Sequence, residues 1–328
     1  MISVLAPGPH TTIQDSGRPG YYAMGLPPSG ALDQYAHACA NLLVGNTEAA
    51  ATLEATMAGP TLGFEQDAIV AVTGADVEVT IDGHPVEMWA AHPIRAGQQL
   101  KIGLARAGAR AYLAVRGGID CPLFLGSRST YTAASIGGLT GGPLVAGDAL
   151  RLGCETAGPA RPGARIDSRL RSHAGDSVSL RVVPGLCTYR FTAESLERFF
   201  TSTYTMTARA DRIGCRLDGP SLTYVEREQP FGAGDDPSNV VDLGYPVGSI
   251  QVPSGTEPIC LLRDAVTGGG YATLGTVISA DLDLLAQARA PDTVRFEPVS
   301  IDDALAARAA SRARLREVRT NLNLLSLF

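Results

Sequence analysis

The sequence has only one lysine, Lys101, among its 27 basic residues. A Walker A phosphate loop needs a lysine beside Ser or Thr after a glycine-rich turn, and Lys101 is followed by Ile102. A Schiff-base enzyme or an amidase with a Ser/Ser/Lys triad would also have to use this residue. Lys101 lies in the alternating segment QQLKIGLA, so we expect an exposed lysine on a strand. A P-loop and a biotin carrier, which needs a Met-Lys-Met hairpin, are therefore excluded.

Motifs typical of metal sites and of several hydrolases are also missing. The six cysteines form no CxxC pair, and the five histidines form neither HExxH nor HxH, so no metal site is predicted. We expect the cysteines to be buried free thiols. The chain has no GxSxG motif, which excludes the nucleophile elbow of an α/β-hydrolase.

Basic charge and long apolar runs are scarce as well. The formal net charge is −6 and the pI is about 5.4, so nucleic acid is not the expected partner. No apolar run approaches the length of a membrane span. The first nine residues lack the basic and apolar regions of a signal peptide, and the cytoplasm is the expected location.

The first half of the chain has the pattern of a β-rich domain with one helix. Residues 31–43 place apolar side chains on one helical face, with Ser29 as the expected N-cap and Gly45 as the stop signal. Because predicted strands follow one another about every ten residues, a barrel or a sandwich is expected. The strands are predicted at 68–73, 76–81, 99–105 and 110–116.

A second unit is predicted after a stretch rich in Ala, Gly, Pro, Arg and Ser. This division gives a first domain at 1–154, a linker at 155–176, a second domain at 177–300 and a C-terminal helix and tail at 301–328. In the second half, strands are predicted at 179–185, 203–208, 258–263, 273–278 and 293–299. Helices are predicted at 193–200 with Thr192 as cap, at 280–288 with Ser279 as cap, and at 302–320.

Four polar clusters flanked by glycine are candidates for chemistry. Asp15 and Arg18 lie on a bent loop, where they can pair with each other or present both charges to a ligand. Arg116 precedes two glycines that can bring backbone N–H groups close to an anion, or that merely form a tight turn.

The other two clusters carry hydroxyl and amide groups. Residues 126–131 interleave hydroxyls with Arg128, a combination that suits a carboxylate, ureido or phosphate group. Gln251 and Asp264 offer acceptors to N–H donors of an amide-like ligand, and the segment 267–271 follows them. The residues alone thus predict a polar site for a small, charged or amide-bearing ligand, without a reaction.

Several long motifs occur along the chain. The motifs are TTIQDSGRPGYYAMGLPPSGALDQYAHACANLLVGN at 11–46, VRGGID at 115–120, LGSRSTY at 125–131, GD at 147–148, ADRIGCRLDGP at 210–220, GSIQVP at 248–253 and GGYATLGTVISADLDLLAQ at 269–287. Together and in this order, they resemble the biotin-dependent carboxyltransferase family over about residues 1–300. That family includes PxpC, which is the C subunit of 5-oxoprolinase, as well as KipA, the so-called allophanate hydrolase subunit 2 and the second half of the urea carboxylase carboxyltransferase domain.

The resemblance implies a mainly β fold with a few helices, arranged as two β-barrel subdomains of cyclophilin-like type. It implies a heterodimer or heterotetramer with a KipI-like or PxpB-like partner. A 5-oxoprolinase would add a LamB/YcsF-type component and would use ATP to open a lactam. A carboxyltransferase would instead take a carboxyl group from carboxybiotin, carried by another protein and loaded by a biotin carboxylase, to urea or another amide or guanidino nitrogen. A KipA-like chain would be a non-catalytic antagonist of a kinase inhibitor.

On this resemblance we expect arginines to face an anion and acidic residues to orient the substrate or accept a proton. The expected catalytic residues are Asp15, Arg18, Arg116, Arg128 and Asp264, and the expected substrate-binding residues are Ser29, Ser127, Thr130, Arg212, Gln251, Thr267 and Tyr271. The chain departs from the family pattern at 242–246, where an acidic side chain is moved or lost, and at Gly142, where an arginine is common. These departures leave the substrate open.

Overall fold

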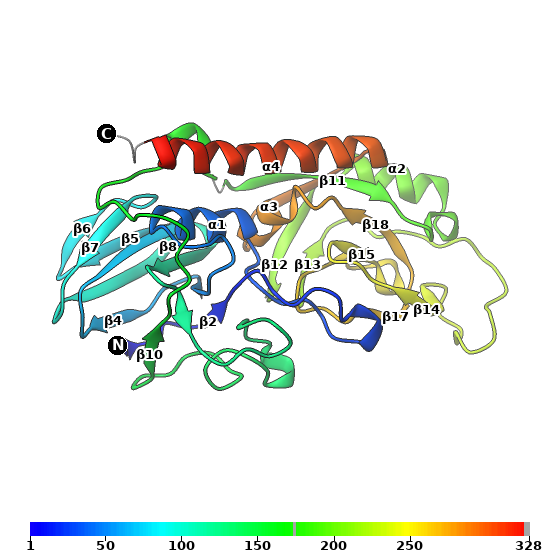
Figure 1. The fold of residues 1–328 in the computed structure, drawn as a ribbon. Helices are drawn as coiled ribbons and strands as arrows, with labels where there is room; N and C mark the ends of the chain where they lie inside the picture. The colour runs from blue at the N-terminus through cyan, green and yellow to red at the C-terminus, as the bar shows by residue number, and fades with distance from the viewer. Residues whose placement is uncertain (173–174, 325–328) are drawn as a thin grey trace. The chain divides into compact units, whose positions relative to one another are not determined.

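The computed structural model describes residues 1–172 and 175–324, which form two compact units. The first unit contains 1–18, 29–172 and 312–324, and the second contains 19–28 and 175–311. The helix α4 (Ile301–Leu324), at the red end of the colour scale in Figure 1, therefore has residues in both units. Within the described ranges, no helix is long and apolar enough to cross a membrane.

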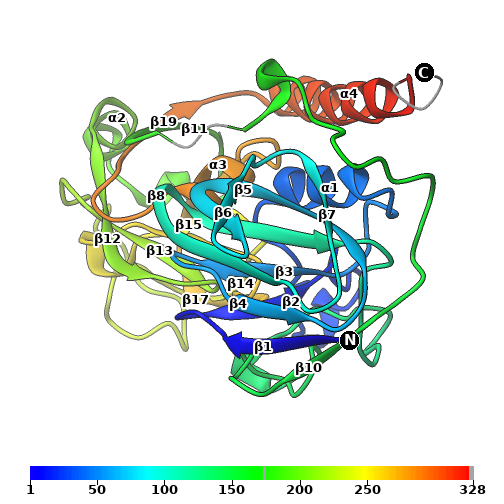
Figure 2. The ribbon, with the colours of Figure 1, turned by 90° about the vertical axis from the view of Figure 1, so that its left-hand side faces the viewer.

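The first unit is built on one large, mostly antiparallel sheet, seen in Figure 2. Its helix is α1 (Gln34–Leu43), which packs on β5 and β8. Its strands are β1 (Ile2–Ala6), β2 (Thr11–Gln14), β3 (Thr52–Thr56), β4 (Thr61–Phe64), β5 (Ala68–Ile81), β6 (His84–Val86), β7 (Ala91–Ile94), β8 (Gln99–Val115), β9 (Ile119–Asp120) and β10 (Ala149–Leu152).

The second unit is a closed barrel with strand order β11-β18-β15-β16-β13-β12-β19, in which the parallel pair β11 and β19 completes the ring. The strands β14 and β17 form a separate ribbon. The helices of this unit are α2 (Ala193–Thr201) and α3 (Leu282–Gln287). The strands are β11 (Ser177–Pro184), β12 (Tyr204–Ala210), β13 (Gly214–Asp218), β14 (Asn239–Gly244), β15 (Ser249–Gln251), β16 (Ile259–Leu261), β17 (Gly268–Tyr271), β18 (Thr273–Val277) and β19 (Thr293–Pro298).

The predicted fold class, mainly β with two barrel subdomains, is confirmed. Helix α2 occurs where it was predicted, and the Thr192 hydroxyl accepts a hydrogen bond of 3.2 Å from the backbone N–H of Ser195. Two pairs of predicted strands are instead single long strands. The segments 68–73 and 76–81 are both parts of β5, and 99–105 and 110–116 are both parts of β8. The β5–β8 register shifts between Gly74 and Val79, and both strands continue past the glycines that lie between the predicted segments.

Two predicted helix caps were wrong. Helix α1 begins at Gln34, because the Asp33 carboxylate accepts from the backbone N–H of Ala36 at 2.8 Å, whereas Ser29 lies earlier in a left-handed turn. Helix α3 begins at Leu282 rather than 280 and has no side-chain cap. The side chain of Asp281, at the N-cap position, is held by the Arg181 guanidinium at 2.6 and 3.0 Å.

Over its described residues 155–172, the predicted linker packs against the first unit. Ile166 and Leu170 are 2% and 5% exposed and belong to the apolar core beneath α1. The α4 residue Arg314 donates to the backbone oxygens of Leu170 and Arg171 at 3.0 and 2.8 Å, and its guanidinium lies 4.3 Å from the ring centre of Tyr35. Residues 155–172 are therefore a packed extension of the first unit, at odds with their loop-like composition.

The cysteines differ in exposure, which gives a direct test of this packing. Cys154 is exposed, whereas the other five are buried, and burial raises the pKa of Cys121 to about 11. We expect N-ethylmaleimide at pH 8 to label one thiol of the folded protein quickly, because only an accessible thiolate reacts. Mass spectrometry of the wild type and Cys154→Ser measures this. Labelling of the folded Cys154→Ser variant at the wild-type rate would contradict the structure.

Candidate functional site

Asp15 forms the centre of a hydrogen-bonded group in the first unit, which we call the Asp15 cluster (Asp15, Ser127, Arg128 and Ser129). One carboxylate oxygen of Asp15 accepts from the hydroxyls of Ser127 and Ser129 at 2.6 and 2.5 Å, and from the Gly17 N–H at 2.7 Å. The other oxygen accepts from the Arg128 N–H at 2.6 Å. Asp15 thus ties the segment after β2 to residues 127–129, which are more than a hundred positions away in sequence.

Arg128 extends from this cluster and is held by two carboxylates. Its guanidinium lies 3.2 Å from Asp120 and 2.6 Å from Glu155, and its side chain is 19% exposed. Burial alone would lower the pKa of Arg128, but the hydrogen bond to Asp120 and the charge of Glu155 outweigh it and raise the pKa. The buried Nε of Arg128 has no hydrogen-bond partner among residues 1–172 and 175–324, so it is a donor that a ligand oxygen could satisfy.

Arg18 also contacts the Asp15 cluster, but its side chain is fully buried. The residue is 1% exposed, its guanidinium donates to the backbone oxygens of Ser129 and Phe124, and it lies 5.9 Å from the Phe124 ring centre. These contacts fix the loop, and they leave Arg128 as the more accessible guanidinium. Thr130 and Ser29 are also fully buried, and Thr130 donates to the backbone oxygen of Ile13 at 3.0 Å.

Arg116 does not join the Asp15 cluster through its guanidinium. Its Nη1 donates to the backbone oxygens of Val44 at 3.0 Å, just after α1, and of Gly158 at 3.1 Å. The two glycines after it adopt positive φ and form a tight turn, which is the alternative that the sequence left open. Arg116 instead lines a separate pocket of the first unit.

The second unit brings Arg212 and Asp264 together as a buried ion pair. Arg212 is 5% exposed and Asp264 is 3% exposed, and two bonds of 2.7 and 3.2 Å join them. The neighbouring Arg263 has a lowered pKa because of its burial and because of the charge of Arg212. Asp264 therefore compensates the positive charge of Arg212 in a crowded interior.

Gln251, Thr267 and Tyr271 all contact Tyr245, and Thr267 does so through the backbone. The Tyr245 hydroxyl donates to the backbone oxygen of Tyr271 at 2.9 Å, accepts from its N–H at 2.6 Å, and interacts with the Gln251 side chain. The Tyr245 N–H donates to the Thr267 oxygen at 2.9 Å. Burial raises the pKa of Tyr245, so the hydroxyl is neutral near pH 7. Tyr271 is 42% exposed and can contact a ligand.

Sequence reasoning missed several residues that organise these sites. Ser129 and Tyr245 carry hydrogen bonds at the centre of each group, and Glu155 was assigned to the linker although it binds Arg128. The hydroxyl run 126–131 contained a signal for Ser129, and the departure from the family pattern at 242–246 included Tyr245, but nothing local marks Glu155. Among the described residues, no group of three or more His, Cys, Asp or Glu side chains is placed to hold a metal ion.

Most of the chain matches a known family. Residues 24–298 match the family described as carboxyltransferase domain, subdomain A and B. The chain belongs to this family. Among relatives with the carboxyltransferase domain, the C subunit of the Haemophilus influenzae 5-oxoprolinase is 36% identical over 324 residues, which are 97% of this chain and 98% of that protein.

Two other similar proteins are much longer than this chain. The urea amidolyase of Lachancea kluyveri is 34% identical over 310 residues, and the aligned part is 91% of this chain but 17% of that protein. The crystal structure of the Kluyveromyces lactis urea carboxylase superposes with a TM-score of 0.92 at 32% identity, covering 97% of this chain and 29% of that one. The chain thus spans less than a third of these urea-processing relatives.

Proposed function

We infer that the chain is the C subunit of a heteromeric, ATP-dependent 5-oxoprolinase that opens a small lactam together with a KipI-like partner. The observation that carries this inference is the match from end to end with a relative named as the C subunit of 5-oxoprolinase, in which 97% of one chain aligns with 98% of the other. In a urea amidolyase, by contrast, the aligned part is only 17% of the protein. The name of that relative, a C subunit, implies a complex with other subunits.

Net opening of the lactam breaks the ring C–N bond and joins the oxygen of water to the carbonyl carbon, while the nitrogen gains a proton. ATP is the co-substrate, and its hydrolysis to ADP and phosphate uses a second water. In this proposal Arg128 faces the oxygen that gains negative charge, because it is the more accessible guanidinium of the Asp15 cluster and its Nε lacks a partner among the described residues. Asp15 positions the backbone of Arg128.

The experiment is reconstitution with the expected KipI-like and LamB/YcsF-like partners, ATP and 5-oxoproline. We expect turnover only when all chains are present.

The second candidate, transfer of a carboxyl group from carboxybiotin to an amide or guanidino nitrogen, is favoured by the TM-score of 0.92 with a urea carboxylase. It predicts carboxylated urea and no dependence on the LamB/YcsF-like partner. A KipA-like antagonist would bind the KipI-like partner tightly and yield no turnover with either substrate.

Arg128→Met removes the guanidinium and keeps most of the apolar stem. We expect kcat/KM for 5-oxoproline to fall about 30- to 1,000-fold, since loss of one preorganised donor to an oxyanion costs about 2–4 kcal/mol. Steady-state kinetics of the reconstituted complex measure this. Arg151→Met, an exposed arginine on β10, is the matched control and should leave kcat/KM unchanged. Wild-type turnover by the Arg128→Met complex would remove Arg128 from the site.

A further inference from the structure

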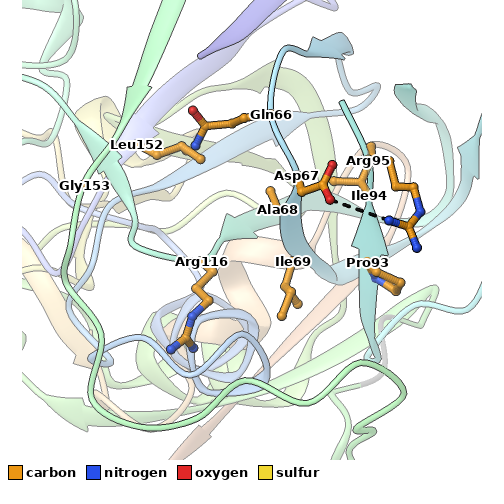
Figure 3. A pocket seen from close by; sticks show the side chains of 10 residues that line it. All are labelled: Gln66, Asp67, Ala68, Ile69, Pro93, Ile94, Arg95, Arg116, Leu152 and Gly153. Carbon is orange, nitrogen blue, oxygen red and sulfur yellow. Dashed lines mark ion pairs between the residues drawn. The ribbon is translucent and has the colours of Figure 1, made fainter. Parts of the chain in front are cut away.

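The pocket lined by Arg116 lies in the first unit, at the end of the sheet where β5 begins and where β7, β8 and β10 end. Its volume is about 450 Å³, within the range of roughly 300–1,000 Å³ that is usual for small-molecule sites. Figure 3 shows its lining, in which Arg116 and Ile69 extend side by side from neighbouring strands and Gln66 faces Leu152. The mouths of β-barrels are common positions for such sites.

The chemistry of the lining combines an apolar wall with hydrogen-bond donors. Ile69, Ile94 and Leu152 supply the apolar surface. At the rim, Arg95 lies 3.6 Å from Asp67, and both side chains are largely exposed. The Asp67 carboxylate also accepts from the Ala96 N–H at 2.9 Å, so its charge is already engaged. The lining therefore has two guanidinium groups, those of Arg95 and Arg116, and one carboxylate, that of Asp67, which gives the pocket a net positive charge.

Arg116 adds donors that the fold does not use. Its Nη1 is bound to backbone oxygens, whereas its Nε and Nη2 make no hydrogen bond within the part of the chain that the structure describes. A guanidinium fixed at one nitrogen and open at two others is prepared to bind a planar carboxylate through two parallel bonds. The neighbouring apolar wall suits a short hydrocarbon group.

We propose that this pocket binds a small monocarboxylate with a short apolar portion, at a site separate from the Asp15 cluster. The proposal does not depend on the activity inferred above. The pocket wall includes Gly153, and Glu155 two residues later binds Arg128, so a ligand here contacts the segment that holds the candidate catalytic arginine.

The test is titration of the full chain with isobutyrate, followed by calorimetry or ligand-observed NMR, with isobutyramide and inorganic phosphate as comparison ligands. We expect isobutyrate to bind at least about tenfold more tightly than either, because the amide lacks the charge and phosphate lacks the apolar group. Arg116→Met and Arg95→Gln should each weaken isobutyrate binding about tenfold. Gln66→Trp, which places a large ring at the rim, should weaken it further.

The matched control is Arg106→Gln. Arg106 is exposed, as Arg95 is at the rim, and lies 3.5 Å from Asp76, but it lines no part of this pocket. Its replacement should leave the affinity unchanged. Undetectable binding of isobutyrate would overturn the proposal, and so would equal binding of isobutyramide or phosphate. Unchanged affinity in Arg95→Gln and Gln66→Trp would overturn it even if Arg116→Met failed to fold.

Discussion

Replacing Asp264 with alanine is expected to destabilise the protein by about 3–5 kcal/mol, because it leaves the buried guanidinium of Arg212 without its ion-pair partner. The effect is large because Arg212 and Asp264 are both almost fully buried and are joined by two bonds. The adjacent charge of Arg263, whose pKa is already lowered, adds repulsion once the carboxylate is gone. Urea unfolding followed by circular dichroism measures the loss.

The double variant Arg212→Met/Asp264→Leu shows whether the stability loss in Asp264→Ala comes from an uncompensated charge or from a general loss of packing. Replacing a buried ion pair by apolar groups of similar size is often close to neutral, so we expect most of the stability to return. Glu257→Ala is the surface control, since Glu257 pairs with the exposed Arg209 and the half-buried Arg216, and it should cost about 1 kcal/mol or less. A double variant as unstable as Asp264→Ala would contradict the account of this pair.

Replacing Asp15 with alanine is expected to cost about 3–5 kcal/mol and to abolish turnover of the reconstituted complex. Alanine removes four accepted hydrogen bonds at once and leaves the buried hydroxyls of Ser127 and Ser129 without their acceptor. Since Asp15 fixes the Arg128 backbone, the guanidinium should lose its position too. The single tryptophan, Trp89, lies in the first unit, so its fluorescence during unfolding reports on this change.

Asp15→Asn gives a graded version of the same test. The amide keeps one acceptor oxygen for Gly17 and the two serines but presents an N–H₂ group to the Arg128 N–H, so we expect a loss of about 1–3 kcal/mol. Asp148→Asn is the control, because that side chain accepts from the Val145 N–H at an exposed turn. A loss in Asp15→Asn equal to that in Asp15→Ala would argue against the assigned acceptor geometry.

The fold was predictable from sequence where local signals and tertiary packing agree. Thr192 caps α2 as expected because the hydroxyl and the following apolar spacing act over one turn. The prediction of a linker at 155–176 was wrong for residues 155–172, because composition does not reveal that Ile166 and Leu170 fill the core beneath α1. Strand β5 was divided at Gly74, although a bulge lets one strand continue through that glycine.

The candidate site was only partly predictable for a different reason. The clusters around Asp15 and Arg128 were visible as separate segments, and the fold brings them into contact through backbone and hydroxyl groups. The direction of a guanidinium is not encoded in its neighbours along the chain. Arg18 is buried, Arg128 is partly exposed and Arg116 lines another pocket, although all three stand beside glycine or serine in the sequence.

The most direct measurement follows glutamate and phosphate together in one mixture of the two expected partners, ATP and 5-oxoproline, with this chain present or omitted. The proposed function predicts equal amounts of glutamate and phosphate when the chain is present, and neither product above background when it is omitted. Equal turnover without the chain, or formation of a carboxylated product in place of glutamate, would contradict it.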